Sequence, residues 1–370
     1  MKTERLFSLD VLRGLDMLLL TVAGPLLMAA QRGWQCFPEG FMRQFSHGWV
    51  CFTLWDIIMP LFIFMCGAAI PFALGRRLQE GKSVFWKHVL ARVALLWFLG
   101  GLVQGKWATL DPLQVSPYAN TLQAIAAGYL IVAAVMSVGS RVLAIAVPVV
   151  LALGYTVALA AYGDYSQFGN LAFKVDDAIL RAILPEDSVR IVKPSYYTWW
   201  LTSAMSGAMA FAGYHATQIL RSGLTPWKRA GALFAYGAGL LAVGFVSEIW
   251  IPCIKPIFTL TFTAQAMGWC AIALAVLYVV NDIWMFRKGL KPVLLFGQMA
   301  LTAYFVSHFF APVLKAAAHL AGDGLIARLP KSAGGFVLTV LQIAALVVVM
   351  LFWRRFKAMR ASARQAASGK

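Results

Sequence analysis

The chain has 370 residues, of which 61% are hydrophobic and 13% charged, and its mean hydropathy is +0.73. A soluble globular domain is close to half apolar and a quarter charged, so this composition excludes an ordinary soluble fold. The net charge of +17 could indicate a nucleic-acid-binding protein, but Lys and Arg also gather in the cytoplasmic loops of membrane proteins, and we therefore expect no nucleic-acid partner.

Apolar runs of about twenty residues recur along the chain, and each is long enough to cross a bilayer as a helix. A membrane barrel would alternate apolar and polar residues, which these runs do not. Because backbone groups in lipid must be paired within a segment, we predict an all-α integral membrane protein, a polytopic bundle of about ten transmembrane helices. We expect one domain over residues 1–370. The predicted helices cover residues 9–31, 50–75, 88–104, 119–138, 141–162, 197–220, 229–247, 257–281, 291–313 and 335–353.

Basic residues divide unevenly between the two sides of this predicted bundle. With the amino terminus inside, the inner segments hold twenty of the 32 Lys and Arg residues, the outer segments hold eleven, and Arg13 lies within the first helix. The positive-inside rule then predicts a multi-pass protein of the cytoplasmic (inner) membrane with both termini cytoplasmic. The basic tail could touch anionic membrane lipid. The longer outer segments, 32–49 and 163–196, are either solvated or functional loops.

The first predicted helix carries Asp10, Arg13 and Asp16 at intervals of three residues, so these side chains project from neighbouring positions on one face. Ionisable groups inside a span are costly and often mark a site. One interpretation is a structural stripe of ion pairs with Arg13 reaching towards the interface. The other is a cationic contact for a phosphate-bearing ligand that enters from the cytoplasm.

Further polar residues fall in or beside the later spans. Asp56 lies within the second predicted helix and needs a partner, while His47, nine residues earlier, lies at its outer mouth. A histidine near a helix end is more often structural than catalytic. Tyr304 and His308 are four residues apart and share one helical face. The remaining candidates are Asn120, Gln123, Glu248 and Lys255, but sequence alone does not bring these residues together.

Five segments occur in the order seen in one known family: RLFSLDVLRGLDM, HGWVCFTLWDIIMPLFIFMCG, NTLQAIAAGYL, IPCIKPIFTLTF and GQMALTAYFVSHF. The chain resembles the transmembrane acyltransferases related to heparan-α-glucosaminide N-acetyltransferase, together with their bacterial relatives. The resemblance runs nearly end to end. It implies that acetyl-CoA donates an acetyl group to an amino sugar or other glycan on the far side of the membrane. It also implies that His47 is catalytic and that Arg13 and Lys255 match the family's arginine and lysine.

The sequence also departs from the family pattern. One residue separates His47 from Trp49 where the family has two, and the usual arginine, asparagine and second asparagine are replaced by Ala124, Ile254 and Met299. An imidazole could act as a general base or form an acetyl-histidine intermediate. Asn120, Gln123 and Lys255 are candidate donors to the thioester oxygen or contacts for the donor.

Three functions therefore stay open. The first is an acyltransferase that uses acetyl-CoA and no metal. The second is a transporter or flippase of a polar solute, although no matched pair of interrupted helices is visible in the sequence. The third is a catalytically silent relative with a structural or partner-binding role. The sequence leaves the acceptor, the acyl chain and a possible homo-oligomer undetermined.

Overall fold

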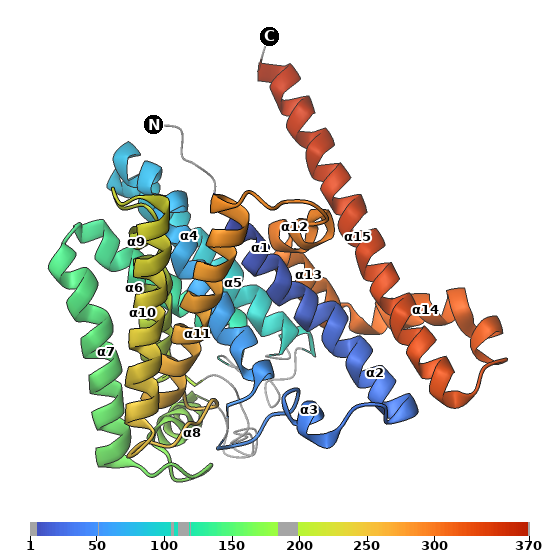
Figure 1. The fold of residues 1–370 in the computed structure, drawn as a ribbon, viewed down its shortest axis with the longest axis horizontal. Coiled ribbons are helices and arrows are strands. Elements are labelled where there is room, and N and C mark those ends of the chain that lie inside the picture. Colours follow the sequence, from blue (N-terminus) through green and yellow to red (C-terminus); the bar gives the residue numbers. More distant parts are fainter. Residues whose placement is uncertain are drawn as a thin grey trace. The chain divides into compact units, whose positions relative to one another are not determined.

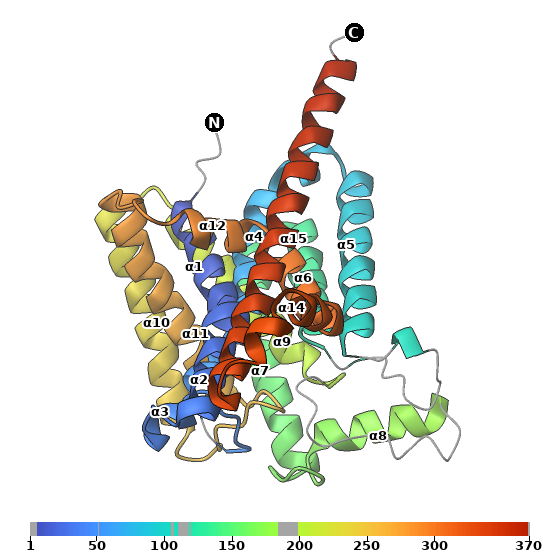
Figure 2. The same cartoon turned by 90° about the vertical axis from the view of Figure 1, so that its right-hand side faces the viewer.

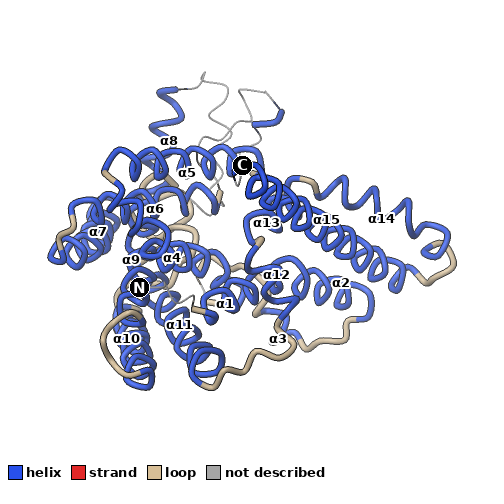
Figure 3. The backbone as a smooth tube through the Cα atoms, turned by 90° about the horizontal axis from the view of Figure 1, so that it is seen from above, coloured by secondary structure: helices blue, strands red, loops and turns tan. Residues whose placement is uncertain are grey.

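The computed structural model describes residues 6–50, 52–104, 107–109, 118, 120–183 and 199–368, and these described residues form helices without any strand (Figure 3). Within the described part of the chain, eight helical segments are long and apolar enough to cross a membrane, and a ninth is counted if one bent helix pair forms a single span. The protein is therefore a multi-pass helical membrane protein, as predicted. The chain divides into two compact units, which we call unit 1 (Met1–Leu12 and Arg43–Lys288) and unit 2 (Arg13–Met42 and Gly289–Lys370).

Most helices in Figure 1 lie on the predicted apolar runs. Helix α1 (Phe7–Leu18) begins in unit 1 and ends in unit 2. Unit 1 further contains η2 (Leu54–Ile57), α4 (Ile58–Glu80), α5 (Lys82–Val103), η3 (Trp107–Thr109), α6 (Thr121–Val138), α7 (Arg141–Tyr162), α8 (Leu171–Ile183), α9 (Ser203–Leu220), α10 (Pro226–Ser247), α11 (Leu260–Tyr278) and η5 (Val279–Ile283). Unit 2 contains η1 (Leu19–Ala23), α2 (Gly24–Trp34), most of α3 (Glu39–Arg43), α12 (Lys291–Gln298), α13 (Ala300–Phe309), α14 (Ala311–Ile326) and α15 (Lys331–Ser368).

Helix α9 corresponds to the sixth predicted span, yet it is not among the segments that are apolar enough to cross a membrane by composition. It packs closely against α4. A Cβ added at Gly67 would lie 1.8 Å from the Ala210 carbonyl oxygen, and one at Gly213 would lie 1.8 Å from the Phe64 carbonyl oxygen. Thr217 Oγ1 also donates to the Ala68 carbonyl at 2.7 Å. Small residues and a side-chain hydrogen bond therefore join two backbones, which is how helices associate in membranes.

Helices α10 and α11 lie side by side as a hairpin (Figure 2). The connection between them is held by threonine hydroxyls: Thr259 Oγ1 accepts from the Ile254 amide at 3.1 Å and donates to the Pro252 carbonyl at 2.9 Å. Thr261 Oγ1 donates to the Ile251 carbonyl at 2.7 Å. These bonds satisfy backbone groups that no regular helix pairs, so the connection has a defined conformation.

In unit 2, α15 packs against both α2 and α14. The ninth predicted span, residues 291–313, differs from the prediction of one continuous helix. The structure has α12 and α13 at 76° to each other, followed by the separate helix α14. Gly297 just before the first break lowers helix propensity by about 1 kcal/mol, and Pro312 opposes continuation through the second. The predicted loop 163–196 likewise contains helix α8, and its residues 184–196 lie outside the described residues.

Candidate functional site

A buried carboxylate begins the second membrane span. Asp56 is the third residue of η2, and its Oδ2 accepts from the backbone amide of Thr53 at 3.0 Å and from the Thr53 hydroxyl at 2.8 Å. A carboxylate three residues into a helical segment commonly reaches back to the amide that precedes the first turn. The local sequence therefore fixes the position of Asp56, whose side chain is 2% exposed.

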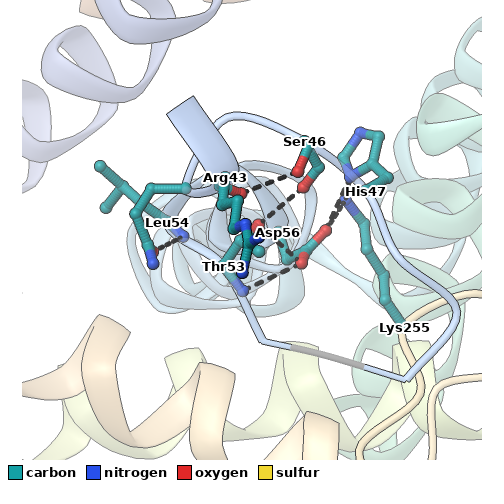
Figure 4. Close-up of polar contacts among 8 residues, drawn as sticks. Arg43, Ser46, His47, Thr53, Leu54, Asp56 and Lys255 are labelled. Carbon is teal, nitrogen blue, oxygen red and sulfur yellow. Dashed lines mark hydrogen bonds and ion pairs between the residues drawn. The ribbon is translucent and has the colours of Figure 1, made fainter. Parts of the chain in front are cut away.

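His47 and Lys255 meet the other oxygen of this carboxylate (Figure 4). His47 Nδ1 lies 2.8 Å from Asp56 Oδ1, and Lys255 Nζ donates to the same oxygen at 3.0 Å. The Lys255 side chain is 7% exposed and the His47 side chain 34%. The ion pair is therefore buried and the imidazole lies at the border of the cluster.

The donors around Asp56 indicate that its carboxylate is ionised and which ring nitrogen of His47 carries a hydrogen. An oxygen pair that receives an ammonium, a backbone amide and a hydroxyl acts as an acceptor throughout, so Asp56 is an ionised carboxylate. His47 Nδ1 must then carry the hydrogen that points at Asp56, so that Nε2 is the nitrogen that accepts a proton when the ring is neutral. Lys255 Nζ and His47 Nδ1 are 3.5 Å apart. Both nitrogens are donors directed at Asp56 Oδ1, so they lie close to each other because they share this acceptor.

The segment that carries His47 is tied to two other parts of unit 1. Trp49 Nε1 donates to the Tyr165 carbonyl at 2.8 Å, which joins this segment to the connection between α7 and α8. The Trp55 amide donates to the Gln44 carbonyl at 2.9 Å, so the residues before His47 are held against η2. The imidazole thus approaches Asp56 from a supported loop, which reduces the entropy lost on adopting a reactive geometry.

Two candidate residues of unit 1 serve other structural partners. Asn120 caps α6, where its Oδ1 accepts from the Leu122 amide at 2.7 Å and its Nδ2 donates to Gln104 Oε1 at 2.8 Å. Gln123 Nε2 lies 3.5 Å from the Trp97 carbonyl oxygen. Both side chains are fully buried. A role of Asn120 or Gln123 towards the acyl donor stays a prediction.

Asp10, Arg13 and Asp16 lie on successive turns of α1, as predicted, with Asp10 in unit 1 and the other two in unit 2. Asp16 is buried, and its Oδ2 accepts no hydrogen bond from the described residues. The proposed contact of Arg13 with a phosphate stays a prediction.

Tyr304 and His308 share a face of α13 in unit 2, as their spacing predicts. The two rings stack with centroids 4.4 Å apart, and His308 Nδ1 donates to the Tyr304 carbonyl at 2.9 Å. That bond holds the His308 ring on its own helix. The structure therefore provides a local, structural function for this histidine.

Two polar residues of unit 1 were not singled out from the sequence: Thr53, within the site, and Asp176, on α8. Thr53 could have been found from the T-x-x-D spacing before an apolar run, which is typical of a helix start. Asp176 on α8 lies in the outer segment 163–196, which the sequence indicated only as a solvated or functional loop. Its side chain is buried and accepts one hydrogen bond, from the Trp200 amide at 3.0 Å. Burial raises the pKa of Asp176 to about 7.

The three-residue cluster can perform proton transfer. A neutral histidine held through Nδ1 by a carboxylate can remove a proton at Nε2, and the carboxylate stabilises the imidazolium that results. The positive charge of Lys255 balances the negative charge of Asp56. Among the described residues, no group of three His, Cys, Asp or Glu side chains is arranged to hold a metal ion.

Comparison with known proteins gives a family match. A family model described as a domain of unknown function (DUF5009) matches residues 5–206. This stretch contains His47, Thr53 and Asp56, whereas Lys255 lies beyond it. No curated protein matches the chain.

Proposed function

The chain belongs to the DUF5009 family, because the matching family model covers more than half of the chain's 370 residues, and we propose that the protein is a membrane-bound acyltransferase. The proposed reaction moves an acetyl group from acetyl-CoA to an amino sugar or other glycan. The observation that carries this proposal is the contact of His47 with the ionised Asp56, whose charge is balanced by Lys255.

In the proposed reaction, His47 Nε2 removes a proton from the amine or hydroxyl of the acceptor as it attacks the thioester carbonyl. A new N–C or O–C bond forms, and the C–S bond of acetyl-CoA breaks. The proton passes from the imidazolium to the leaving thiolate, so the products are the acetylated acceptor and CoA. General base catalysis of this kind accelerates a reaction by roughly 10²–10⁴-fold.

Asp56 and Lys255 act through the histidine in this proposal. Asp56 selects the tautomer with hydrogen on Nδ1 and stabilises the imidazolium by Coulomb attraction. Lys255 holds the carboxylate in place from the rigid connection between α10 and α11. Both are therefore positioning residues, and the reactive atom belongs to His47.

We place the protein in the cytoplasmic (inner) membrane with both termini inside, which is supported by the excess of basic residues in the inner segments. His47 then faces the periplasm, where a glycan arrives, and the donor reaches the site from the cytoplasm. Arg13, near the inner end of the first span, is the proposed contact for a phosphate of CoA.

The test is transfer of radiolabelled acetyl groups from acetyl-CoA to glucosamine by the purified protein in detergent. His47→Gln should lower turnover by roughly 10²–10⁴-fold and leave CoA affinity nearly unchanged, because the base acts on the acceptor. His319→Gln is the matched control, since Nδ1 of the half-buried His319 lies 2.7 Å from Asp323 Oδ1 in a similar histidine–carboxylate pair. Full turnover in His47→Gln would overturn the assignment.

A second experiment separates the two chemical routes. Mixing the wild type with labelled acetyl-CoA and no acceptor, followed by denaturation, leaves label on the protein if an acetyl-histidine forms. Direct attack leaves the protein unlabelled while transfer to an added acceptor proceeds.

A transporter of a polar solute is the second candidate, because the structure interrupts one span. Helices α12 and α13 meet at 76°, and interrupted helices line the solute sites of many transporters. Flux of amino sugar into proteoliposomes without acetylation would favour this function. Binding of neither acetyl-CoA nor sugar would favour a silent relative.

A further inference from the structure

Unit 1 contains two cavities that meet at one point. The larger, of about 870 Å³, is bounded by α7, α9, α10 and α11. The smaller, of about 500 Å³, is bounded by α6, α7 and α9. Ile145, His215 and Gln218 line both cavities, so the two cavities adjoin at these residues. We call the larger part the chain groove and the smaller part the head cavity.

The chain groove has the lining and the length of a site for a hydrocarbon chain. Its wall is mostly apolar, and the polar residues of the wall are His215, Gln218, Ser222, Tyr236 and Thr263. On α9 it extends from Ala208 to Ile219, which is about 16 Å along a helix that rises 1.5 Å per residue. Half of the bilayer hydrocarbon core is about 15 Å thick. An acyl chain from one leaflet therefore fits entirely within the groove.

The head cavity is polar at the end formed by the start of α7. It is lined by Ser140 and Arg141 at the start of α7, together with Tyr214, His215 and Gln218 from α9. Arg141 is the one permanently charged residue of the described lining, which contains no carboxylate. The amino-terminal end of α7, a helix of 22 residues, adds a positive partial charge to that of the guanidinium. An anion, and a phosphate in particular, is the group that this end favours.

His215 connects the two parts. Its Nε2 donates to the Ala144 carbonyl at 2.9 Å, so the ring is held at the junction between the polar and the apolar walls. An occupant must therefore be polar and anionic on one side of His215 and apolar on the other. Membrane lipids have this arrangement, and α7 is the least buried of the candidate spans, so lipid has access to the groove.

We propose that the head cavity and chain groove bind one membrane lipid with an anionic phosphate headgroup. The phosphate contacts Arg141 and the first turn of α7, and one acyl chain lies along α9. This site uses none of the residues of the proposed acyl transfer, so the two proposals stand or fall separately.

The test measures lipid binding to the full-length protein in detergent by native mass spectrometry. The probes are phosphatidylglycerol, phosphatidylcholine with the same acyl chains, and glycerol 3-phosphate, which has the head but no chain. The wild type should bind phosphatidylglycerol about tenfold more tightly than phosphatidylcholine, a difference of about 1.4 kcal/mol, and glycerol 3-phosphate far more weakly than either. Equal binding of the free glycerol phosphate would overturn the assignment of the chain groove.

Two variants test the two parts. Val149→Trp fills the groove from a half-exposed position of α7 and should weaken both lipids about tenfold, whereas Val157→Trp, a lipid-exposed position outside the groove, should not. Val243→Trp on α10 is a second groove variant if the first does not fold.

Arg141→Gln should abolish the preference for phosphatidylglycerol, and Arg354→Gln should preserve it. Unchanged lipid binding in both groove variants, or an unchanged preference in Arg141→Gln, overturns the proposal.

Discussion

Unit 1 buries two carboxylates, Asp56 and Asp176, in opposite electrostatic environments. Asp56 receives the Lys255 ammonium, the His47 ring and both the amide and hydroxyl of Thr53. Asp176 receives one backbone amide, from Trp200. The burial is similar, at 1% and 5% exposure, so the donors make the difference.

Burial alone does not define a reactive carboxylate. Moving a charge out of water costs several kcal/mol, which a cation and good hydrogen bonds offset. Asp56 has these partners and stays ionised, so it can stabilise a second, transient positive charge on His47. Asp176 has no cation among its described hydrogen-bond partners, and burial favours its protonated form near neutral pH. Only the first arrangement suits proton transfer.

Removing the cation should make Asp56 resemble Asp176, and we expect the largest effect on stability here. Lys255→Met keeps the length of the side chain but leaves the buried carboxylate with the His47 ring and Thr53, which should cost roughly 3–5 kcal/mol. Thermal unfolding in detergent measures this loss. The double variant Lys255→Met with Asp56→Asn should recover much of it, while acetyl transfer stays low. A single variant as stable as Lys228→Met, an exposed control, would contradict the buried pair.

The pH dependence of stability should reveal Asp176. Its folded pKa of about 7 lies above the ordinary 3.8, so between these values the unfolded chain has lost the proton that the folded protein retains. The free energy of unfolding should therefore fall by up to about 4 kcal/mol as pH rises from about 4 to 7. Above about pH 7 it should level off. Asp176→Asn should flatten this profile in thermal unfolding. Asp177→Asn, beside it and paired with Arg181, should leave the slope unchanged.

The smallest expected effect tests the hydrogen bonds of Thr53. Thr53→Val keeps the shape but removes the hydroxyl that contacts Asp56 Oδ2, which should cost about 1 kcal/mol. Thr53→Ser retains the hydroxyl and should behave like the wild type within about 0.5 kcal/mol. Chemical unfolding of the two variants side by side gives the comparison. A loss in Thr53→Ser with no loss in Thr53→Val would instead assign the effect to the methyl group.

The sequence by itself determined the class of the fold. Because lipid provides no hydrogen-bonding partners, an apolar run of about twenty residues must become a helix, whatever surrounds it. The same cost of ionisable groups in lipid identified Asp56 as a residue that needed a partner. The interruption between α12 and α13 and the helical part of the segment after α7 were not predicted, since their local residues permit several conformations.

Tertiary structure decided which polar groups meet. Asp56 and Lys255 are 199 residues apart, and no periodicity relates positions so distant along the chain. Their contact depends on the packing of α4 near α11 and on the threonine bonds that shape the connection before α11. Burial of Asp176 likewise depends on where α8 lies. A sequence shows which groups are costly to bury. The fold decides whether a buried carboxylate has a cation within 3 Å, as Asp56 does, or is buried with a backbone amide alone, as Asp176 is.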